Sequence, residues 1–303
     1  MSHQHGHHGQ RGSHGHDIDW AERGAELVTA AEVGAPAVNL ALDWLVERLP
    51  AATAVMDIGA GPGVAACALA TRLPDARVLA VDGAKPLLAL ARARAERLGV
   101  ADRVSVRLAD LPVGLADLPQ VDLVWVSGVV HHLPDPVATL RTLGALVRRG
   151  GLLAIREGGL PARFLPDGVA PGLLPRLEAI TEELVAAGGR PSGILSHEGG
   201  WPDLMRAAGL TPAGSRTFLL DLPAPLSAEA RSYVQWQLDG PGVGRRAPDP
   251  RRCQGTGHPL GLGQPRGRDA APGHLPAQRE HDPHRGSGCL VRQPDFLILG
   301  VSA

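Results

Sequence analysis

The chain has 303 residues, which fits one α/β domain with an insertion, and its 44% apolar content is enough for a hydrophobic core. Only 3% of the residues are aromatic and the net charge is -1, so stacking surfaces are scarce and there is no basic footprint for nucleic acid or anionic lipid. No run of about eighteen apolar residues exists, and the N-terminus carries histidines and glycines where a signal peptide needs an apolar stretch. We therefore expect a cytoplasmic protein with a small-molecule partner and neither a nucleic-acid nor a membrane partner, of undetermined oligomeric state.

Residues 1–16 form a low-complexity segment rich in histidine and glycine, which predicts a solvated, disordered tail. Cys67, Cys253 and Cys289 are far apart and form no C-x-x-C pair. We therefore expect neither a disulfide framework nor a metal site, and we expect Cys67 to be a small buried residue.

Residues 17–50 have apolar side chains at helical spacing, and we interpret them as an N-terminal helical segment. Pro36 is placed for the first turn of a helix. Trp44 is expected in the core, because a tryptophan at helical spacing is more often core than part of a ligand entrance.

The most informative segment is VMDIGAGPGVAACALA, Val55 to Ala70. An apolar strand ends in Asp57, and the alternating glycines Gly59, Gly61 and Gly63 open a helix of small residues. Glycine has no Cβ and tolerates positive φ, so such a loop lets the backbone approach a ligand closely.

Acidic residues also end the next two predicted strands. Asp82 ends VLAVD, and Asp110 follows the strand VSVRL. Acids at successive strand ends beside a glycine loop suit a ligand that carries a ribose diol and an adenine amine.

Residues 51–159 alternate between strand and helix patterns. The predicted strands are 54–58, 77–82, 104–109, 121–126 and 152–157, and the predicted helices are 63–73, 84–98 and 136–147. This alternation predicts a parallel sheet covered by helices on both faces, with all carboxyl ends of the strands at one crevice.

The pattern loosens after residue 159. Residues 160–212 are expected to form a helical cap, and residues 213–240 and 295–303 the last part of the sheet. The predicted elements there are helices 173–187, 201–210 and 226–238 and strands 215–222 and 294–301.

Residues 241–294 are irregular, and about a third of them are glycine or proline. Two explanations stay open, a natural disordered insertion and a local reading-frame shift. Both predict that limited proteolysis cuts this segment first.

The chain resembles the class I S-adenosylmethionine-dependent methyltransferases. Beside the glycine loop, the resemblance rests on VDLVWVSGVVHHLPDP, Val121 to Pro136, and RRGGLLAIREGG, Arg148 to Gly159. It extends over residues 17–240 and implies a Rossmann-like, doubly wound, mostly parallel seven-stranded sheet. It also implies an N-terminal helical lid, a helical insertion after the fifth strand, and S-adenosylmethionine as cofactor for methyl transfer to O, N or C of a small molecule.

The resemblance also implies roles for individual residues. The glycine loop would flank the methionine part of the cofactor, Asp82 would bind both ribose hydroxyls and Asp110 the adenine amine. The whole implied cofactor set is Asp57, Gly59, Ala60, Gly61, Gly63, Asp82, Gly83, Ala109, Asp110, Leu111 and Ser127.

His131 and His132, just past the fourth strand, are the candidates for a general base, with Glu157 as another crevice-facing polar group. Adjacent side chains diverge, so at most one of the two histidines should face the crevice. An alternative role for both is to order the loop through hydrogen bonds.

Two other functions stay open. Gly61 to Ala66 also fits the G-x-G-x-x-A fingerprint of an NAD(P)-dependent oxidoreductase. In that pattern the first glycine follows the strand directly, whereas here Asp57 closes the strand and Gly59 stands in front. The second alternative is a relative that binds the cofactor without catalysis.

Overall fold

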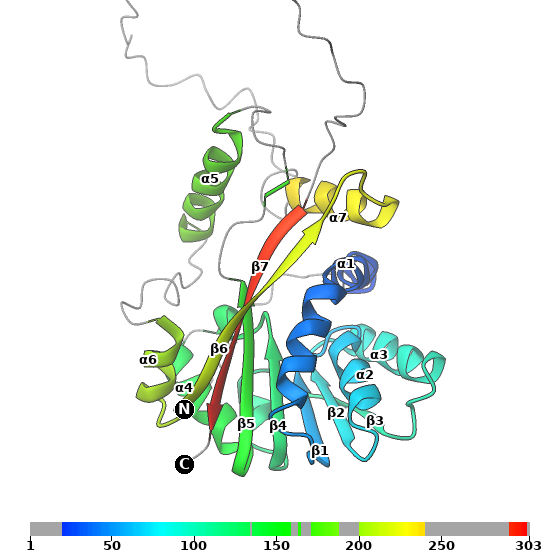
Figure 1. Cartoon of the computed structure of the whole chain (residues 1–303), viewed down its shortest axis with the longest axis vertical. Helices are drawn as coiled ribbons and strands as arrows, with labels where there is room; N and C mark the ends of the chain where they lie inside the picture. Colours follow the sequence, from blue (N-terminus) through cyan, green and yellow to red (C-terminus); the bar gives the residue numbers. More distant parts are fainter. Residues whose placement is uncertain are drawn as a thin grey trace, which may run out of the picture. The chain divides into compact units, whose positions relative to one another are not determined.

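The structure is a computed structural model that describes residues 20–133, 135–158, 163–164, 171–187, 200–239 and 291–301. Seven strands form one sheet in the order β3-β2-β1-β4-β5-β7-β6 (Figure 1). Strands β1 to β5 run parallel, and β7 is antiparallel to β5. The predicted fold class, a mostly parallel seven-stranded α/β sheet, is confirmed. The strands are β1 (Ala54–Ile58), β2 (Arg77–Asp82), β3 (Val104–Leu108), β4 (Val121–Ser127), β5 (Val147–Gly158), β6 (Thr211–Leu222) and β7 (Val291–Val301).

The chain divides into two compact units. The first comprises residues 1–162, 189–220 and 293–303, and the second comprises residues 163–188 and 221–292. The first unit contains the helices α1 (Trp20–Val46), α2 (Val64–Arg72), α3 (Lys85–Arg97), α4 (Pro136–Ala145) and α6 (Gly200–Ala207), and the short 3-10 helices η1 (Val113–Leu115) and η2 (Val130–His132). The second contains α5 (Leu173–Ala187) and α7 (Ala228–Asp239).

The main core lies between one face of the sheet and helices α4 and α6. Alternate residues of a strand point to opposite faces, so Met56 and Ile58 of β1 enter this core while Asp57 points to the other face. Helix α6 was expected in the cap. Its Leu204 and Met205 are instead fully buried in this core, because two adjacent apolar side chains on one short helix gain most by packing against the sheet.

Helix α1 packs on α2 and α3. Pro36 lies inside this helix and not at its first turn, so that part of the prediction is wrong. A proline inside a helix costs about 3 kcal/mol, since it removes a backbone donor and crowds the preceding turn. Burial of the neighbouring Val33, Ala37 and Ala41 offsets that cost.

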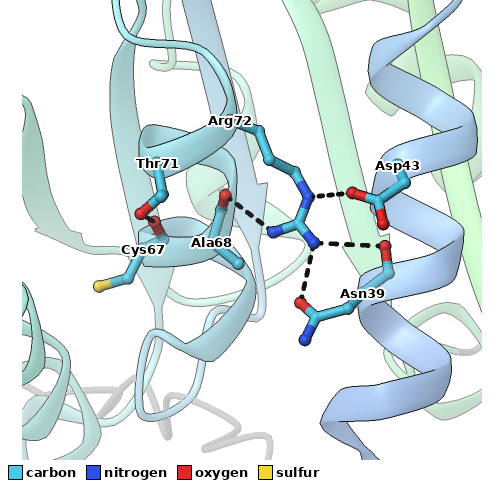
Figure 2. A network of polar contacts seen from close by, with 6 residues as sticks. All are labelled: Asn39, Asp43, Cys67, Ala68, Thr71 and Arg72. Carbon is cyan, nitrogen blue, oxygen red and sulfur yellow. Dashed lines mark hydrogen bonds and ion pairs between the residues drawn. The ribbon is translucent and has the colours of Figure 1, made fainter.

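Arg72 joins α2 to α1, as Figure 2 shows. Its Nε donates to Asp43 at 2.6 Å, and its Nη2 donates to the side-chain oxygen of Asn39 at 3.2 Å. Its Nη1 donates back to the Ala68 carbonyl of its own helix at 3.2 Å. These contacts hold the arginine in one orientation, so α1 docks in a defined register against α2.

The C-terminal half of α1 also buries aromatic surface. Trp44 is 9% exposed and packs edge-to-face against Phe218, with ring centroids 6.1 Å apart. The guanidinium of Arg48 lies 3.7 Å from the centre of the Trp44 ring. The expectation that Trp44 is a core residue is confirmed.

By length and composition, residues Gly24–Val46 of α1 could cross a membrane. The helix nevertheless carries Glu32 and Asp43, which pair with Arg94 of α3 and Arg72 of α2. Core helices of soluble proteins pass the same test of length and composition, and we interpret α1 as a helix of the folded unit.

Most of the segment predicted to be irregular lies outside the described residues, as does the tail of residues 1–16. Residues 291–294 are an exception, because β7 begins at Val291 and not at 294. The choice between an insertion and a frame shift therefore stays a hypothesis.

Candidate functional site

The glycine loop after β1 folds over the end of β2. The backbone N–H groups of Gly59 and Ala60 both donate to the carbonyl oxygen of Val81, at 2.8 and 3.0 Å. The N–H of Gly61 donates to Asp82 Oδ2 at 2.9 Å. The loop is therefore held by the neighbouring strand and by the acid that ends it.

All three glycines of the loop have positive φ, at 71° for Gly59, 52° for Gly61 and 74° for Gly63. A Cβ at Gly59 would lie 2.2 Å from Val129 Cγ2, and a Cβ at Gly63 would lie 2.7 Å from the Cβ of Ala91. A Cβ at Gly61 would meet no atom of the described residues within 4 Å. Gly59 and Gly63 thus serve packing, while the backbone at Gly61 borders open space.

Asp82 lies at the carboxyl end of β2 and is partly buried. Its Oδ1 accepts the N–H of Ala84 at 2.8 Å, while Oδ2 accepts that of Gly61. A carboxylate can accept about four hydrogen bonds, so each oxygen keeps acceptor capacity for a ligand.

The predicted residues after β2 and β3 lie next to one another. The N–H of Ala109 donates to the carbonyl of Asp82 at 3.1 Å, and a Cβ at Gly83 would lie 3.5 Å from Asp110 Oδ1. Asp110 is exposed, whereas Leu111 is partly buried against the main core. The exposed carboxylate of Asp110 is therefore available to a ligand near Asp82.

Asp57 is 2% exposed and points away from the main core. It accepts the backbone N–H of Ala66, and its Oδ2 has no hydrogen-bond partner within the described ranges. Burial raises the pKa of Asp57 from 3.8 to about 7, the Ala66 N–H lowers it, and the negative charge of Asp82 adds to the rise. Asp57 is therefore a buried carboxyl group that links the end of β1 to the first turn of α2.

The end of β4 contributes Ser127 and Gly128. Ser127 Oγ accepts from Arg156 Nη1 at 2.9 Å, and the Gly128 N–H donates to the Arg156 carbonyl at 2.9 Å. Gly128 has a φ of 65°, and a Cβ there would meet nothing within 4 Å. Its backbone thus borders open space as Gly61 does.

The loop after Gly128 enters η2, where His131 meets Glu157 of β5. His131 Nδ1 lies 2.6 Å from Glu157 Oε2, and Glu157 Oε1 accepts the Val130 N–H at 3.0 Å. The side chain of His131 is 46% exposed and that of Glu157 is 3% exposed. One buried carboxylate thus binds both the backbone and a side chain of this loop.

Two expectations about these residues are wrong. Glu157 is not a polar group that faces the crevice, because it shares the buried face of β5 with Leu153 and Ile155. The side chains of His131 and His132 do not diverge either, since their ring centroids are 3.8 Å apart at an interplanar angle of 46°. Contact between two flat rings favours this arrangement within the tight turn of a 3-10 helix.

Within the described ranges, no group of three or more His, Cys, Asp or Glu side chains could hold a metal ion. Cys67 is fully buried and is a free cysteine in the part of the chain that the structure describes, which confirms the expectation that it is a small buried residue.

Comparison with known proteins identifies the family. A methyltransferase-domain family model matches residues 56–153. The trans-aconitate 2-methyltransferase of Variovorax paradoxus is 31% identical over 193 residues, which cover 62% of this chain and 68% of that protein. The chain belongs to the class I S-adenosylmethionine-dependent methyltransferases.

Two further matches cover a smaller share of the matched protein. A ubiquinone biosynthesis O-methyltransferase of Pseudomonas aeruginosa is 32% identical over an alignment that covers 44% of this chain and 54% of that protein. A solved O-methyltransferase family protein of Burkholderia thailandensis is 18% identical with a TM-score of 0.44, covering 65% of this chain and 59% of that one. The chain spans about half the length of most of the curated relatives it matches.

The chain brings its sequence-predicted residues together at the carboxyl ends of β1 to β4. They form one group around the glycine loop and Asp82 and a second group at η2, and the contact of Gly59 with Val129 joins the two. Sequence reasoning missed the pairing of His131 with Glu157. The alternation of Leu153, Ile155 and Glu157 along β5 could have indicated that Glu157 is buried.

Proposed function

We propose that this chain binds S-adenosylmethionine and transfers its methyl group to a small-molecule acceptor. The observation that carries the proposal is the glycine loop, whose Gly61 borders open space and donates to the Asp82 carboxylate. Membership of the methyltransferase family supports it. The net charge of -1 favours a small acceptor over a nucleic acid.

The residues present fit the cofactor. The backbone at Gly59 to Gly63 would hold its methionine part, Asp82 would accept hydrogen bonds from its ribose hydroxyls, and Asp110 would accept one from its adenine amine. Among the described residues, the open space at Gly61 and the remaining acceptor capacity of Asp82 support a ligand with hydrogen-bond donors at this loop.

When bound, the cofactor supplies a methyl group that a sulfonium sulfur has already activated. The chain must therefore mainly align the acceptor and exclude water. An acceptor hydroxyl or amine also needs a base near its proton. We propose His131 for that role, because Glu157 holds its ring in one orientation while nearly half of its side chain stays exposed.

Removing the Asp82 carboxylate should weaken cofactor binding. We expect Asp82→Ala to raise the Kd for S-adenosylhomocysteine by about ten- to a hundredfold, since two charge-assisted hydrogen bonds are worth about 1.5 to 3 kcal/mol. Isothermal titration calorimetry measures this Kd. Asp75→Ala, which removes an exposed acid in the turn before β2, is the matched control and should leave the Kd unchanged.

A Kd for Asp82→Ala equal to that of the wild type would refute the proposed place of the ribose. Circular dichroism of both variants checks that they fold. Transfer of a labelled methyl group to trans-aconitate, the acceptor in the name of one relative, then distinguishes an enzyme from a protein that only binds the cofactor.

A further inference from the structure

We propose that Glu157 is a positioning residue that fixes His131 as the tautomer with its proton on Nδ1, leaving the Nε2 lone pair to accept the proton of the methyl acceptor. This inference rests on the proposed function. It gives a defined role to Glu157, which the sequence predicted only as a crevice-facing polar group.

The two oxygens of Glu157 have different partners. Oε1 accepts the backbone N–H of Val130 at 3.0 Å, and a backbone N–H can only donate. Oε2 lies 2.6 Å from His131 Nδ1. The backbone contact therefore fixes which oxygen faces the ring.

This arrangement determines the tautomer of His131. An ionised carboxylate has no hydrogen to donate, so the hydrogen bond at Oε2 requires a proton on Nδ1. Neutral imidazole then carries its lone pair on Nε2, at the far side of the ring. Because Nδ1 is bound to the buried carboxylate, Nε2 is the ring nitrogen left for an acceptor, on a side chain that is 46% exposed.

The position of the ring relative to the glycine loop is also constrained. Val129 packs against Gly59, and the next two residues are Val130 and His131, both bound to Glu157. The ring of His132 lies against that of His131, with centroids 3.8 Å apart, and also limits its rotation. The pair therefore holds Nε2 in a set place next to the proposed cofactor loop.

The chemistry balances with the groups named. The acceptor oxygen or nitrogen gives its proton to His131 Nε2 and forms a bond to the methyl carbon. The bond between that carbon and sulfur breaks, and its electron pair goes to sulfur. The imidazolium that results is stabilised by the negative charge of Glu157, as in other carboxylate–histidine pairs.

Glu157→Gln tests the inference, because the Val130 N–H constrains the new amide. The amide oxygen must accept from Val130, so the amide NH₂ faces Nδ1 and donates to it. We expect the tautomer of His131 to invert, from mainly Nδ1-protonated in the wild type to mainly Nε2-protonated in the variant. Nitrogen-15 NMR of the imidazole rings reads this directly, with the His131 signals assigned through His131→Gln.

Two control variants and a second readout of Glu157→Gln make the result specific. His132→Gln removes the neighbouring ring but should leave the His131 tautomer unchanged. Glu157→Asp keeps an acceptor-only group and should retain the Nδ1-protonated form, which separates tautomer control from simple disturbance of the loop. Glu157→Gln should keep the Kd for S-adenosylhomocysteine within about twofold while methyl transfer falls by at least about a hundredfold.

A wild-type His131 protonated mainly on Nε2, or the same tautomer in wild type and Glu157→Gln, would overturn the inference. The NMR experiment needs neither cofactor nor acceptor. Failure of S-adenosylhomocysteine to bind would instead count against the proposed function, so the two failures are distinguishable.

Discussion

Gly63→Ala is expected to lower the free energy of unfolding by about 2 to 5 kcal/mol. Gly63 caps α2 with a φ of 74° and a ψ of 23°, and a side chain in this left-handed conformation costs about 1 to 2 kcal/mol. The added Cβ would also lie 2.9 Å from the Cα of Ala91 in α3. Backbone cannot yield as a flexible side chain can, so overpacking adds about 1 to 3 kcal/mol. Urea denaturation measures the loss.

Gly61→Ala is the matched control for this prediction. Its φ of 52° carries similar strain, but the new Cβ would meet no atom within 4 Å. We therefore expect a fold only about 1 to 2 kcal/mol less stable, together with weaker binding of S-adenosylhomocysteine. Equal stability of the Gly63→Ala and Gly61→Ala variants would contradict the close packing of α2 against α3.

Asp57→Asn is expected to stabilise the protein increasingly as the pH rises. Burial raises the pKa of the folded Asp57 to about 7, well above the ordinary value of 3.8. Folding therefore favours the protonated acid, and its contribution to stability is fully present below about pH 4 and is lost as the pH rises towards 7. Asparagine carries no charge and does not incur this loss.

The difference in unfolding free energy between Asp57→Asn and the wild type should therefore grow between pH 4 and pH 7, by an amount on the order of 4 kcal/mol. Urea denaturation at several pH values measures this difference. Asp75→Asn, which neutralises an exposed acid, should show little change over the same range. A difference independent of pH would contradict the raised pKa of the buried Asp57.

The βα units between residues 54 and 157 could be predicted from the sequence because each element has a local signal. Apolar runs mark the strands, and the glycine loop marks the first strand-to-helix turn. The observed bounds of β1 and β2 coincide with the predicted ranges 54–58 and 77–82. The residues that need positive φ in the loop are glycines, so the loop geometry was also accessible from the sequence.

Features decided by tertiary packing could not be predicted in this way. Pro36 is a local signal for a helix start, but the packing of α1 on α2 and α3 carries the helix through it. Helix α6 belongs with the first unit and α5 with the second, although the sequence placed both in one cap.

The pairing of His131 with Glu157 is a further feature of this kind. The two residues are 26 positions apart, and they meet only because η2 folds back over the end of β5. The spacing of apolar residues in either segment does not show that the two segments meet. The sequence therefore predicted His131 as a candidate base and Glu157 as a separate polar group.

The central claim is that the glycine loop and Asp82 form an S-adenosylmethionine site and not a nicotinamide site. Titration calorimetry of the whole chain with S-adenosylhomocysteine and, separately, with NADH tests it most directly. We predict saturable binding of S-adenosylhomocysteine and no heat of binding with NADH. Tight binding of NADH without a response to S-adenosylhomocysteine would contradict the claim.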